Sequence, residues 1–304
     1  MRRETDLAII GAGVAGLTAA QIAARHGIGV LVIEQLAPGG QISTVERIAN
    51  FPGFAEGVAG YELGPMLQQQ AEEAGADFQF DTIERIEAEG AGFRLIGFES
   101  EVLARAVIVA AGSRRRALDV PGEGDFEGRG VSHCASCDGP FFQDKPVVVV
   151  GGGDSGFDEA ELLAGLASEV TIVHREAAPH AQQGTRDRVA ALPNVRLVGN
   201  SEVVGIEGDE QVTRVRLRGA DGASSELPCA GVFLYAGLVP ASDFLGDFVA
   251  RDAGGAIVTN TALETDRPGL FAAGDIRSGA AALLASAAGD GATAALAAVR
   301  HLAR

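Results

Sequence analysis

Tryptophan is absent from the 304-residue chain, aromatic residues make up only 5% of it, and cysteine occurs three times. Three cysteines are too few to staple a small secreted scaffold, so the fold must depend on a hydrophobic core, for which 47% hydrophobic residues suffice. Basic residues are also scarce, since 24 Lys and Arg against 41 Asp and Glu leave a net charge of −17. Such a surface repels a phosphate backbone, which argues against a nucleic-acid partner and leaves room for a partner with a basic docking face.

Long hydrophobic runs are absent as well. The apolar stretch that begins at Ala280 is interrupted at residues 289–291, so we expect no membrane span. Near the start, Arg2 and Arg3 are followed almost at once by the strand-like run 7–10, without the hydrophobic region and cleavage site of a signal peptide. These features predict a cytoplasmic protein with no membrane partner.

One pattern occurs twice in the chain. Residues 6–35 read DLAIIGAGVAGLTAAQIAARHGIGVLVIEQ, and residues 146–175 read PVVVVGGGDSGFDEAELLAGLASEVTIVHR. Each copy has an apolar run, a G-x-G-x-x-G turn, a helical stretch and a second apolar run, and the last residue of that run follows the first glycine by 23 residues. This spacing predicts an α/β fold with two Rossmann-like, doubly wound dinucleotide-binding domains. The predicted phosphate-binding residues are Gly11, Gly13, Ala15 and Gly16 in the first copy and Gly151, Gly153, Asp154, Ser155 and Gly156 in the second.

The glycines of these turns have a physical purpose. The first makes the tight turn, the second lets the backbone approach a pyrophosphate, and the third lets the helix pack closely on the strand. The pyrophosphate then lies at a helix N-terminus, where free N–H groups favour anions. The alternative is that the glycines merely permit tight turns in an ordinary α/β sheet, and it carries more weight for the second copy.

The residues that end the two second strands differ. Glu34 is a carboxylate suited to accept a hydrogen bond from a ribose 2′-OH. The equivalent position is His174, followed by Arg175 and Glu176. Arg175 can meet a 2′-phosphate, whereas Glu176 beside it opposes one. We assign His174 and Arg175 to the second nucleotide site, with a solvated strand end as the alternative.

The rest of the chain indicates one domain interrupted by another. An apolar run at 107–110 is followed by the basic stretch SRRR, and a second run at 232–236 is followed by Gly237 and Pro240. Both changes of composition are typical of domain exits. The tail, with GLFAAGD at 269–275 and an Ala-rich helix running to about His301, is unlike the second unit that precedes it.

Cys134 and Cys137 lie in the segment SHCASCDGPFF, residues 132–142. Closed zinc sites need four ligands, and neither Cys229 nor the five histidines supply a second pair at zinc-ligand spacing, so we expect no metal. A purely structural role suits Cys229, beside an apolar strand, better than the CxxC pair, whose neighbours are small and polar. A CxxC at a helix start favours disulfide exchange, and Asp138 is placed to move the proton, with capping as its alternative role.

Six motifs carry a resemblance to a known family. GAGVAG, GGQ at 39–41, NFPGF at 50–54, CASCDG, GGGDSG and FAAGD occur in this order along essentially the whole chain. In this order they resemble the low-molecular-weight flavoprotein thioredoxin reductases.

The resemblance implies a discontinuous FAD domain over residues 1–115 and 245–304, interrupted by a pyridine-nucleotide-type domain over residues 116–244 that carries the cysteines. It also implies a homodimer, and a swivel of one domain that presents the dithiol and the nicotinamide to the flavin in turn. By matching position, Cys137 is the thiol nearer the flavin, Cys134 attacks the disulfide of the substrate, and Asp138 is the acid/base. The same matching assigns FAD binding to Gly11, Gly13, Ala15, Gly16, Glu34, Gly40, Gln41, Asn50, Ala111, Gly112, Gly274 and Asp275.

The sequence departs from the family at the electron-donor site. Members that use NADPH carry HRRxxxR after the second strand, but here HREAAPH places Glu176 and His180 where two arginines are expected. Each lost charge-assisted contact to phosphate is worth ~1.5–3 kcal/mol, so NADH is favoured over NADPH. Ala282 and Leu283 also occupy the place of an Arg-Gln pair that the family has close to the flavin.

The leading hypothesis is therefore an FAD-dependent disulfide reductase that passes electrons from NAD(P)H through FAD and the cysteine pair to a thioredoxin-like disulfide. A protein donor such as ferredoxin is an alternative. Another is the reverse reaction, in which lipoyl or other small dithiols are oxidised. A third alternative is a non-enzymatic redox sensor, against which the intact CxxC-Asp argues.

Overall fold

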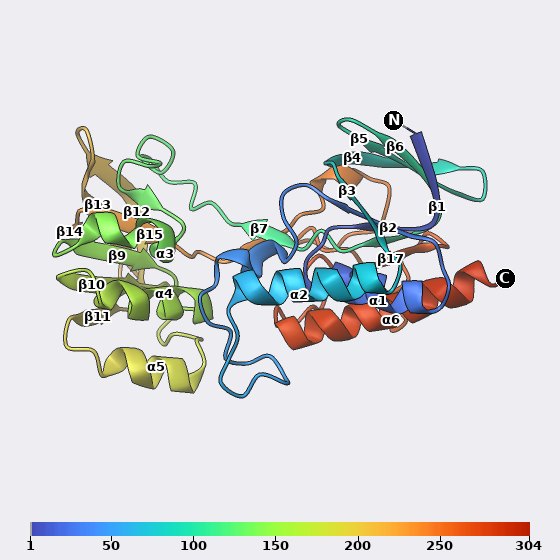
Figure 1. Cartoon of the computed structure of the whole chain (residues 1–304). Helices are drawn as coiled ribbons and strands as arrows, with labels where there is room; N and C mark the ends of the chain where they lie inside the picture. Colours follow the sequence, from blue (N-terminus) through green and yellow to red (C-terminus); the bar gives the residue numbers. More distant parts are fainter. Residues whose placement is uncertain (1) are drawn as a thin grey trace. The chain divides into compact units, whose positions relative to one another are not determined.

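The computed structural model describes residues 2–304, which divide into two compact units. The first unit comprises the chain up to Arg114 together with Val239–Arg304, and the second, Arg115–Leu238, is inserted into it (Figure 1). The chain passes between the units through β7 (Ser113–Arg115) and β16 (Leu238–Pro240), which pair with each other. The boundaries between the units thus lie one and six residues before the 115/116 and 244/245 predicted from the sequence.

A seven-stranded sheet forms the centre of the first unit. Its order is β3-β2-β1-β6-β5-β4, with β17 pairing β6; β1, β2, β3, β6 and β17 run parallel, and β4 and β5 are antiparallel. The elements are β1 (Arg2–Ile10), α1 (Val14–Arg25), β2 (Val30–Glu34), η1 (Gly40–Thr44), α2 (Gly60–Glu73), β3 (Asp77–Phe80), β4 (Ile83–Glu89), β5 (Gly92–Gly97), β6 (Glu101–Val109), η3 (Asp243–Leu245), β17 (Leu270–Ala272) and α6 (Leu284–Leu302).

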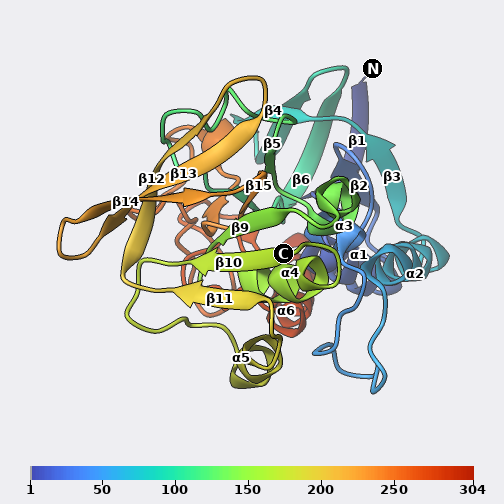
Figure 2. The same ribbon diagram turned by 90° about the vertical axis from the view of Figure 1, so that its left-hand side faces the viewer.

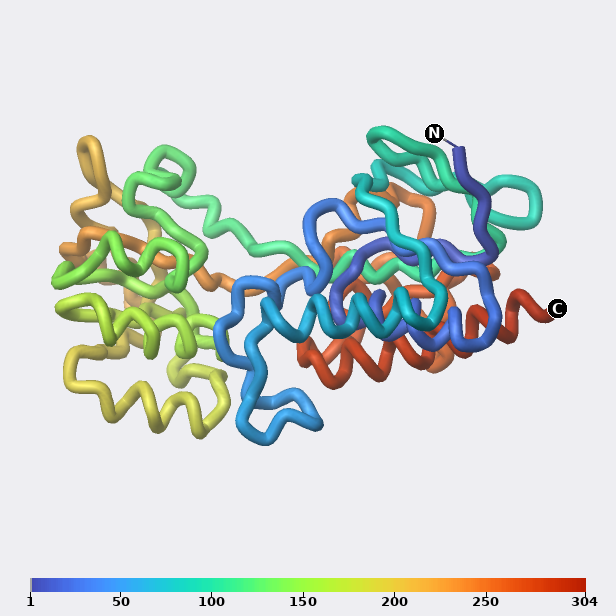
Figure 3. The backbone as a smooth tube through the Cα atoms, viewed as in Figure 1, coloured from blue at the N-terminus to red at the C-terminus, as the bar shows by residue number. Residues whose placement is uncertain are grey.

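Alternate residues of the central strands enter two different cores. Leu7 and Ile9 of β1 pack on one face of the sheet against alanine-rich α1 and α6, which run side by side in Figure 3. Ala8 and Ile10 pack on the other face, against residues of β4, β5 and the segment that contains Ile257. Because both faces are covered, β2 is buried along its whole length, as is typical of parallel strands.

The second unit repeats this plan on a smaller scale. Its parallel sheet has the order β11-β10-β9-β15-β8, as Figure 2 shows for the four longer strands, and a three-stranded antiparallel sheet has the order β12-β13-β14. The elements are β8 (Val131–Ser132), α3 (Ala135–Asp138), η2 (Gly139–Phe142), β9 (Pro146–Val150), α4 (Asp154–Ala164), β10 (Glu169–Val173), α5 (Gln183–Ala190), β11 (Val195–Val198), β12 (Ser201–Gly208), β13 (Val212–Gly219), β14 (Ser224–Pro228) and β15 (Gly231–Leu234).

Here too the valines of one strand alternate between layers. Val147 and Val149 of β9 pack with Phe157 of α4, while Val148 and Val150 pack with the three-stranded sheet. Cys229 is buried in the second of these cores, which confirms its prediction as a small core residue, and burial raises the pKa of its thiol to about 12. Within residues 2–304, no helix has the length and hydrophobicity that a membrane crossing requires.

The main sheet of each unit has a point where strand order reverses, at the strand that precedes the glycine-rich turn. In the first unit β1 lies between β2 and β6, and in the second β9 lies between β10 and β15. Ligands of open α/β sheets bind outside the carboxyl ends of the strands at such a point. The fold therefore places both predicted turns where a dinucleotide would bind.

Candidate active site and nucleotide-binding loops

The first glycine-rich turn is closely packed where the fold requires glycine and open where a ligand would lie. A Cβ at Gly11 would lie 2.5 Å from the carbonyl oxygen of Ala110, and one at Gly16 would lie 1.9 Å from that of Gly11. Gly13, the N-cap of α1, has φ −73°, which any residue can adopt, and a Cβ there would meet nothing within 4 Å. The backbone therefore does not require glycine at position 13, and the open space beside the N-terminus of α1 fits a phosphate group.

Glu34 ends β2 and reaches back to the same turn. It is buried, and its carboxylate accepts hydrogen bonds from the N–H groups of Ala12 (2.7 Å) and Leu36 (2.9 Å). A carboxylate has about four acceptor positions, so Glu34 can still accept from a ribose hydroxyl. Its place at the turn agrees with the role predicted from the sequence.

The other residues predicted to bind FAD come from several loops of the first unit. A Cβ at Gly40 would lie 3.4 Å from the Cα of Gly13, and one at Gly274 would lie 3.0 Å from the Cβ of Ala15. Ala111 and Gly112 follow β6, whose C-terminal residue Val109 pairs with Ile10. Asn50 lies exposed in the loop that precedes α2.

Gln41 and Asp275 are joined through Ser113, which the sequence analysis did not single out. The Gln41 side chain donates to the Ser113 hydroxyl (2.7 Å), and that hydroxyl lies 3.4 Å from the Asp275 carboxylate. Burial raises the pKa of Asp275, the hydrogen bond from Ser113 opposes this shift, and the charge of Asp290 adds to it. The three side chains form a polar cluster in the first unit.

A buried ion pair supports the loop that carries Asp275. Asp290 of α6 accepts from the Gly274 N–H (3.1 Å) and from Nε (2.6 Å) and Nη2 (2.8 Å) of Arg277. The Arg277 and Asp290 side chains are only 17% and 12% exposed. The sequence analysis did not predict this pair, because Arg277 lies in a loop and Asp290 lies 13 residues away in the alanine-rich helix α6.

The second glycine-rich turn is packed against the backbone in the same way as the first. A Cβ at Gly151 would lie 2.2 Å from the carbonyl oxygen of Tyr235, and one at Gly156 would lie 2.5 Å from that of Gly151. Tyr235 follows β15 as Ala110 follows β6, so the two turns pack against equivalent strand ends. Ser155 is exposed in the first turn of α4.

The segment after β10 folds back over this second turn. The N–H groups of His180 and Ala181 donate to the carbonyl of Gly152, and the Asp154 carboxylate accepts from the backbone and side chain of Gln182. A Cβ at Gly153 would lie 2.9 Å from Nε2 of His180. The space that is open at Gly13 is thus lined by an imidazole at Gly153.

Glu176 also reaches the second turn. A Cβ at Gly152 would lie 3.0 Å from the Cβ of His174 and 3.5 Å from Oε2 of Glu176. Gly152 is the counterpart of Ala12, whose N–H donates to Glu34. His174 itself is buried, with Nδ1 3.9 Å from the Glu176 carboxylate, and Arg175 is exposed. The carboxylate that lies at this turn therefore comes from Glu176 and not from the strand-end residue.

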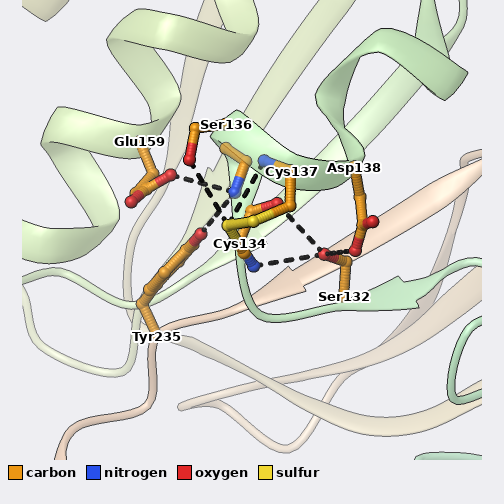
Figure 4. Close-up of a disulfide and its surroundings, with 8 residues drawn as sticks. Ser132, Cys134, Ser136, Cys137, Asp138, Glu159 and Tyr235 are labelled. Carbon is orange, nitrogen blue, oxygen red and sulfur yellow. Dashed lines mark hydrogen bonds between the residues drawn. A yellow bond between two sulfur atoms is a disulfide. The ribbon is translucent and has the colours of Figure 1, made fainter. Parts of the chain in front are cut away.

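Cys134 and Cys137 form a disulfide at the start of α3 (Figure 4). Cys134 is the N-cap of this helix, and its sulfur accepts from the Cys137 N–H (3.2 Å) and lies 3.3 Å from the Ser136 hydroxyl. Cys134 is half-buried and Cys137 is exposed. The predicted disulfide at a helix start is confirmed.

Asp138 is held next to this pair by a residue that the sequence analysis missed. The buried Ser132 hydroxyl donates to Asp138 (2.6 Å) and accepts from the Cys134 N–H (3.2 Å), as Figure 4 shows. Glu159 and Tyr235 approach the other side of Cys134. The position of Ser132 just before the CxxC was a usable signal, whereas Glu159 and Tyr235 gave none, because they are distant in the sequence.

The two nucleotide-type turns and the disulfide define a class of protein. Residues 5–292 match the family of pyridine nucleotide-disulphide oxidoreductases, and the chain belongs to this family. It is a flavin-dependent disulfide oxidoreductase, and the family implies FAD and NAD(P)H as its cofactors.

Within the family, the chain is similar to thioredoxin reductases. It is 38% identical to thioredoxin reductase of Treponema pallidum over 99% of this chain and 98% of that protein. It is 41% identical to that of Bacillus subtilis over 95% and 92%. The solved thioredoxin reductase of Lactococcus lactis superimposes with a TM-score of 0.95 at 34% identity, over 98% of this chain and 99% of that one. The resemblance found in the sequence is thereby confirmed.

Proposed function

We propose that the protein transfers two electrons from NADH, through FAD and the Cys134–Cys137 pair, to the disulfide of a thioredoxin-like protein. The observation that carries this proposal is the disulfide at the start of α3, with Asp138 held beside it, in a chain with two dinucleotide-type turns. Thioredoxin is the partner implied by the names of the relatives, and a lipoyl-type dithiol is the second candidate substrate.

We assign FAD to the first unit, which the sequence predicts over residues 1–115 and 245–304. The open space at Gly13, the uncapped N-terminus of α1 and the carboxylate of Glu34 fit its pyrophosphate and ribose. These residues would hold FAD, which would supply the electrons that reduce the Cys134–Cys137 disulfide. Gln41 and Asp275, together with Ser113, offer polar groups for the rest of the cofactor, and the remaining predicted residues, Gly11, Ala15, Gly16, Gly40, Asn50, Ala111, Gly112 and Gly274, belong to the same proposed site.

The cysteine pair and Asp138 carry out the exchange. In the reduced pair the Cys134 thiolate attacks one sulfur of the substrate disulfide, which forms a mixed disulfide and expels a substrate thiolate. The Cys137 thiolate then attacks the Cys134 sulfur, which restores the internal disulfide and releases the second substrate thiolate. Each expelled thiolate takes up one proton, and we assign its delivery to Asp138. Overall, the Cys134–Cys137 dithiol is oxidised to a disulfide and the substrate disulfide is reduced to a dithiol, so no further oxidant is required.

The second unit, which the sequence predicts over residues 116–244, is the proposed site of the pyridine nucleotide, bound by Gly151, Gly153, Asp154, Ser155, Gly156, His174 and Arg175. Oε2 of Glu176 lies 3.5 Å from a Cβ placed on Gly152, the counterpart of Ala12, and a carboxylate near this turn suits acceptance of a hydrogen bond from an adenosine ribose 2′-OH. A 2′-phosphate would meet that carboxylate, and the cation next to it in the sequence is Arg175. This arrangement favours NADH over NADPH.

Oligomeric state and location are proposed on the family resemblance. We expect a cytoplasmic homodimer, and gel filtration combined with light scattering would measure its mass.

The donor proposal is tested by anaerobic mixing with NADH or NADPH, followed through bleaching of the flavin absorption. NADH should bleach the flavin faster. The double variant Glu176→Arg, His180→Arg should reverse the preference, since each new contact to phosphate is worth ~1.5–3 kcal/mol, or about tenfold or more. The control Glu210→Arg makes the same charge change as Glu176→Arg in the exposed turn between β12 and β13 and should leave the ratio unchanged.

Two outcomes would contradict the donor proposal. Faster bleaching by NADPH in the wild-type protein would mean that Arg175 suffices for the phosphate and that Glu176 does not select the nucleotide. If neither nucleotide bleaches the flavin, the donor is a protein such as ferredoxin, or the enzyme oxidises dithiols; oxygen uptake with dihydrolipoamide would identify the second case.

A further inference from the structure

Glu159 is a half-buried acid next to the cysteine pair, and the exchange reaction assigns it no role. It lies in the second turn of α4, and its Oε2 accepts a hydrogen bond from the N–H of Ala135 at 3.0 Å. This N–H belongs to the peptide bond that directly follows Cys134. Glu159 is therefore one hydrogen bond and one peptide unit away from the half-buried cysteine (Figure 4).

Tyr235 meets the same N–H from the other side. Its hydroxyl oxygen lies 3.2 Å from the nitrogen of Ala135, at the end of β15. Two acceptors from separate elements thus share one amide donor, while Ser132 accepts from the Cys134 N–H on the preceding side. The Ala135 N–H is directed to Glu159 and Tyr235, whereas the Cys137 N–H and the Ser136 hydroxyl lie at the Cys134 sulfur.

The surroundings of Glu159 shift its pKa in opposing directions, with a net rise. Burial raises its pKa; the hydrogen bonds from Ala135 and Tyr235 oppose this shift. Burial also raises the pKa of Tyr235, and the charge of Glu159 adds to that shift. Above its raised pKa, the carboxylate places a negative charge beside the site where the Cys134 thiolate forms.

We propose that Glu159 is a positioning residue for Cys134: it fixes the amide that follows this cysteine, and its charge opposes a thiolate on the cysteine sulfur. Asp138, held by Ser132, lies at the other end of the short helix and is the proposed proton donor. The two acids then have separate tasks, since Asp138 delivers protons and Glu159 sets how readily Cys134 is deprotonated. This proposal deepens the disulfide exchange proposed above.

Other charged and titratable groups also face Cys134 or Glu159. His133 precedes Cys134 and is paired with Glu127 at 3.2 Å, and Asp138 lies on the same short helix. Arg115 and Asp158 act on Glu159, the first lowering and the second raising its pKa. All of them remain in the variants compared below, so their titration cancels in the comparison.

The test measures the alkylation rate of Cys134 by iodoacetamide as a function of pH, in the Cys137→Ser protein with and without Glu159→Gln. Glutamine keeps an acceptor for the Ala135 N–H and removes the charge. The midpoint of the rate profile should fall by about one pH unit, the size expected when a nearby like charge is removed. Mass spectrometry assigns the modified cysteine. Because alkylation needs neither nucleotide nor a protein substrate, failure here is distinct from failure of the proposed electron donor or partner.

A matched control is available on the same helix. Glu161→Gln removes the same charge, but Glu161 is exposed to solvent in a pair with Arg188, so the profile should not move. Equal profiles for Glu159→Gln and its parent would overturn the proposal, and so would an equal shift for Glu161→Gln.

A second measurement uses the intact cysteine pair. In Glu159→Gln the equilibrium of the Cys134–Cys137 pair with a thiol buffer at high pH should shift toward the dithiol by up to tenfold, which corresponds to about 30 mV. Tyr235→Phe keeps the Glu159 charge and should move the equilibrium less. If Tyr235→Phe moved it as far as Glu159→Gln, the effect would be structural rather than due to charge, and the charge component of the proposal would be wrong.

Discussion

The ion pair of Arg277 and Asp290 allows the support of the proposed flavin site to be tested quantitatively. Asp290→Ala removes the acceptor of three hydrogen bonds, two of them from the guanidinium, and leaves a mostly buried cation unpaired. Breaking a fully buried pair on one side costs about 3–5 kcal/mol. Because the two side chains keep some exposure, we expect about 3 kcal/mol.

The lost stability should be that of the first unit, since Asp290 accepts the hydrogen bond of the Gly274 N–H next to Asp275. The assay is urea-induced release of FAD, followed by the rise in flavin fluorescence. Asp290→Ala should release the cofactor at a clearly lower urea concentration than wild type. Asp77→Ala serves as the control, because Asp77 is 72% exposed in its pair with Arg3 and surface pairs contribute only about 0–1 kcal/mol.

A double-mutant cycle separates the pair from its surroundings. Arg277→Ala alone leaves the Asp290 carboxylate without its cation, whereas the double variant removes both charges of the pair. The double variant should therefore lose about 2 kcal/mol less stability than the sum of the two single variants. The reasoning fails if the two costs simply add. It also fails if Asp290→Ala releases FAD at the same urea concentration as Asp77→Ala.

Three further predictions concern other sites. Gly13→Val should weaken FAD binding by tenfold or more but leave the unfolding of the apoprotein within about 0.5 kcal/mol, because the position has an ordinary φ and open space; equal FAD affinity by titration would contradict this. Cys137→Ser should abolish disulfide reduction while NADH still bleaches the flavin, with Cys229→Ala as the active control; turnover in Cys137→Ser would refute the relay. Burial acts to raise the pKa of Asp81, but hydrogen bonds from the Ser100 hydroxyl and backbone N–H groups hold it below its ordinary value. The contribution of this carboxylate to the free energy of unfolding is therefore present above pH ~4 and is lost as the pH falls through the lowered pKa. Urea midpoints between pH 6 and 3 should therefore fall less in Asp81→Asn than in wild type, and parallel curves would show that this carboxylate contributes nothing.

The sequence by itself determined the features that depend on neighbouring residues. The two strand–turn–helix–strand repeats, the helix that ends near His301 and the cysteine pair at a helix start all follow from local patterns. Each of these patterns spans a short segment of the chain, so local steric preferences are enough to specify the structure it forms. Motif order along the chain was likewise enough to identify the family.

Only the tertiary structure decided which distant residues complete the sites. Glu159 and Tyr235 meet at the N–H of Ala135 because β15 lies beside β9, which leads into α4. Glu176 comes near Gly152, the counterpart of the Ala12 that donates to Glu34, although the two carboxylates differ in their distance from the strand end. Such contacts depend on strand order and on the path of loops. These are set by how the whole core packs, so no single segment of the sequence encodes them.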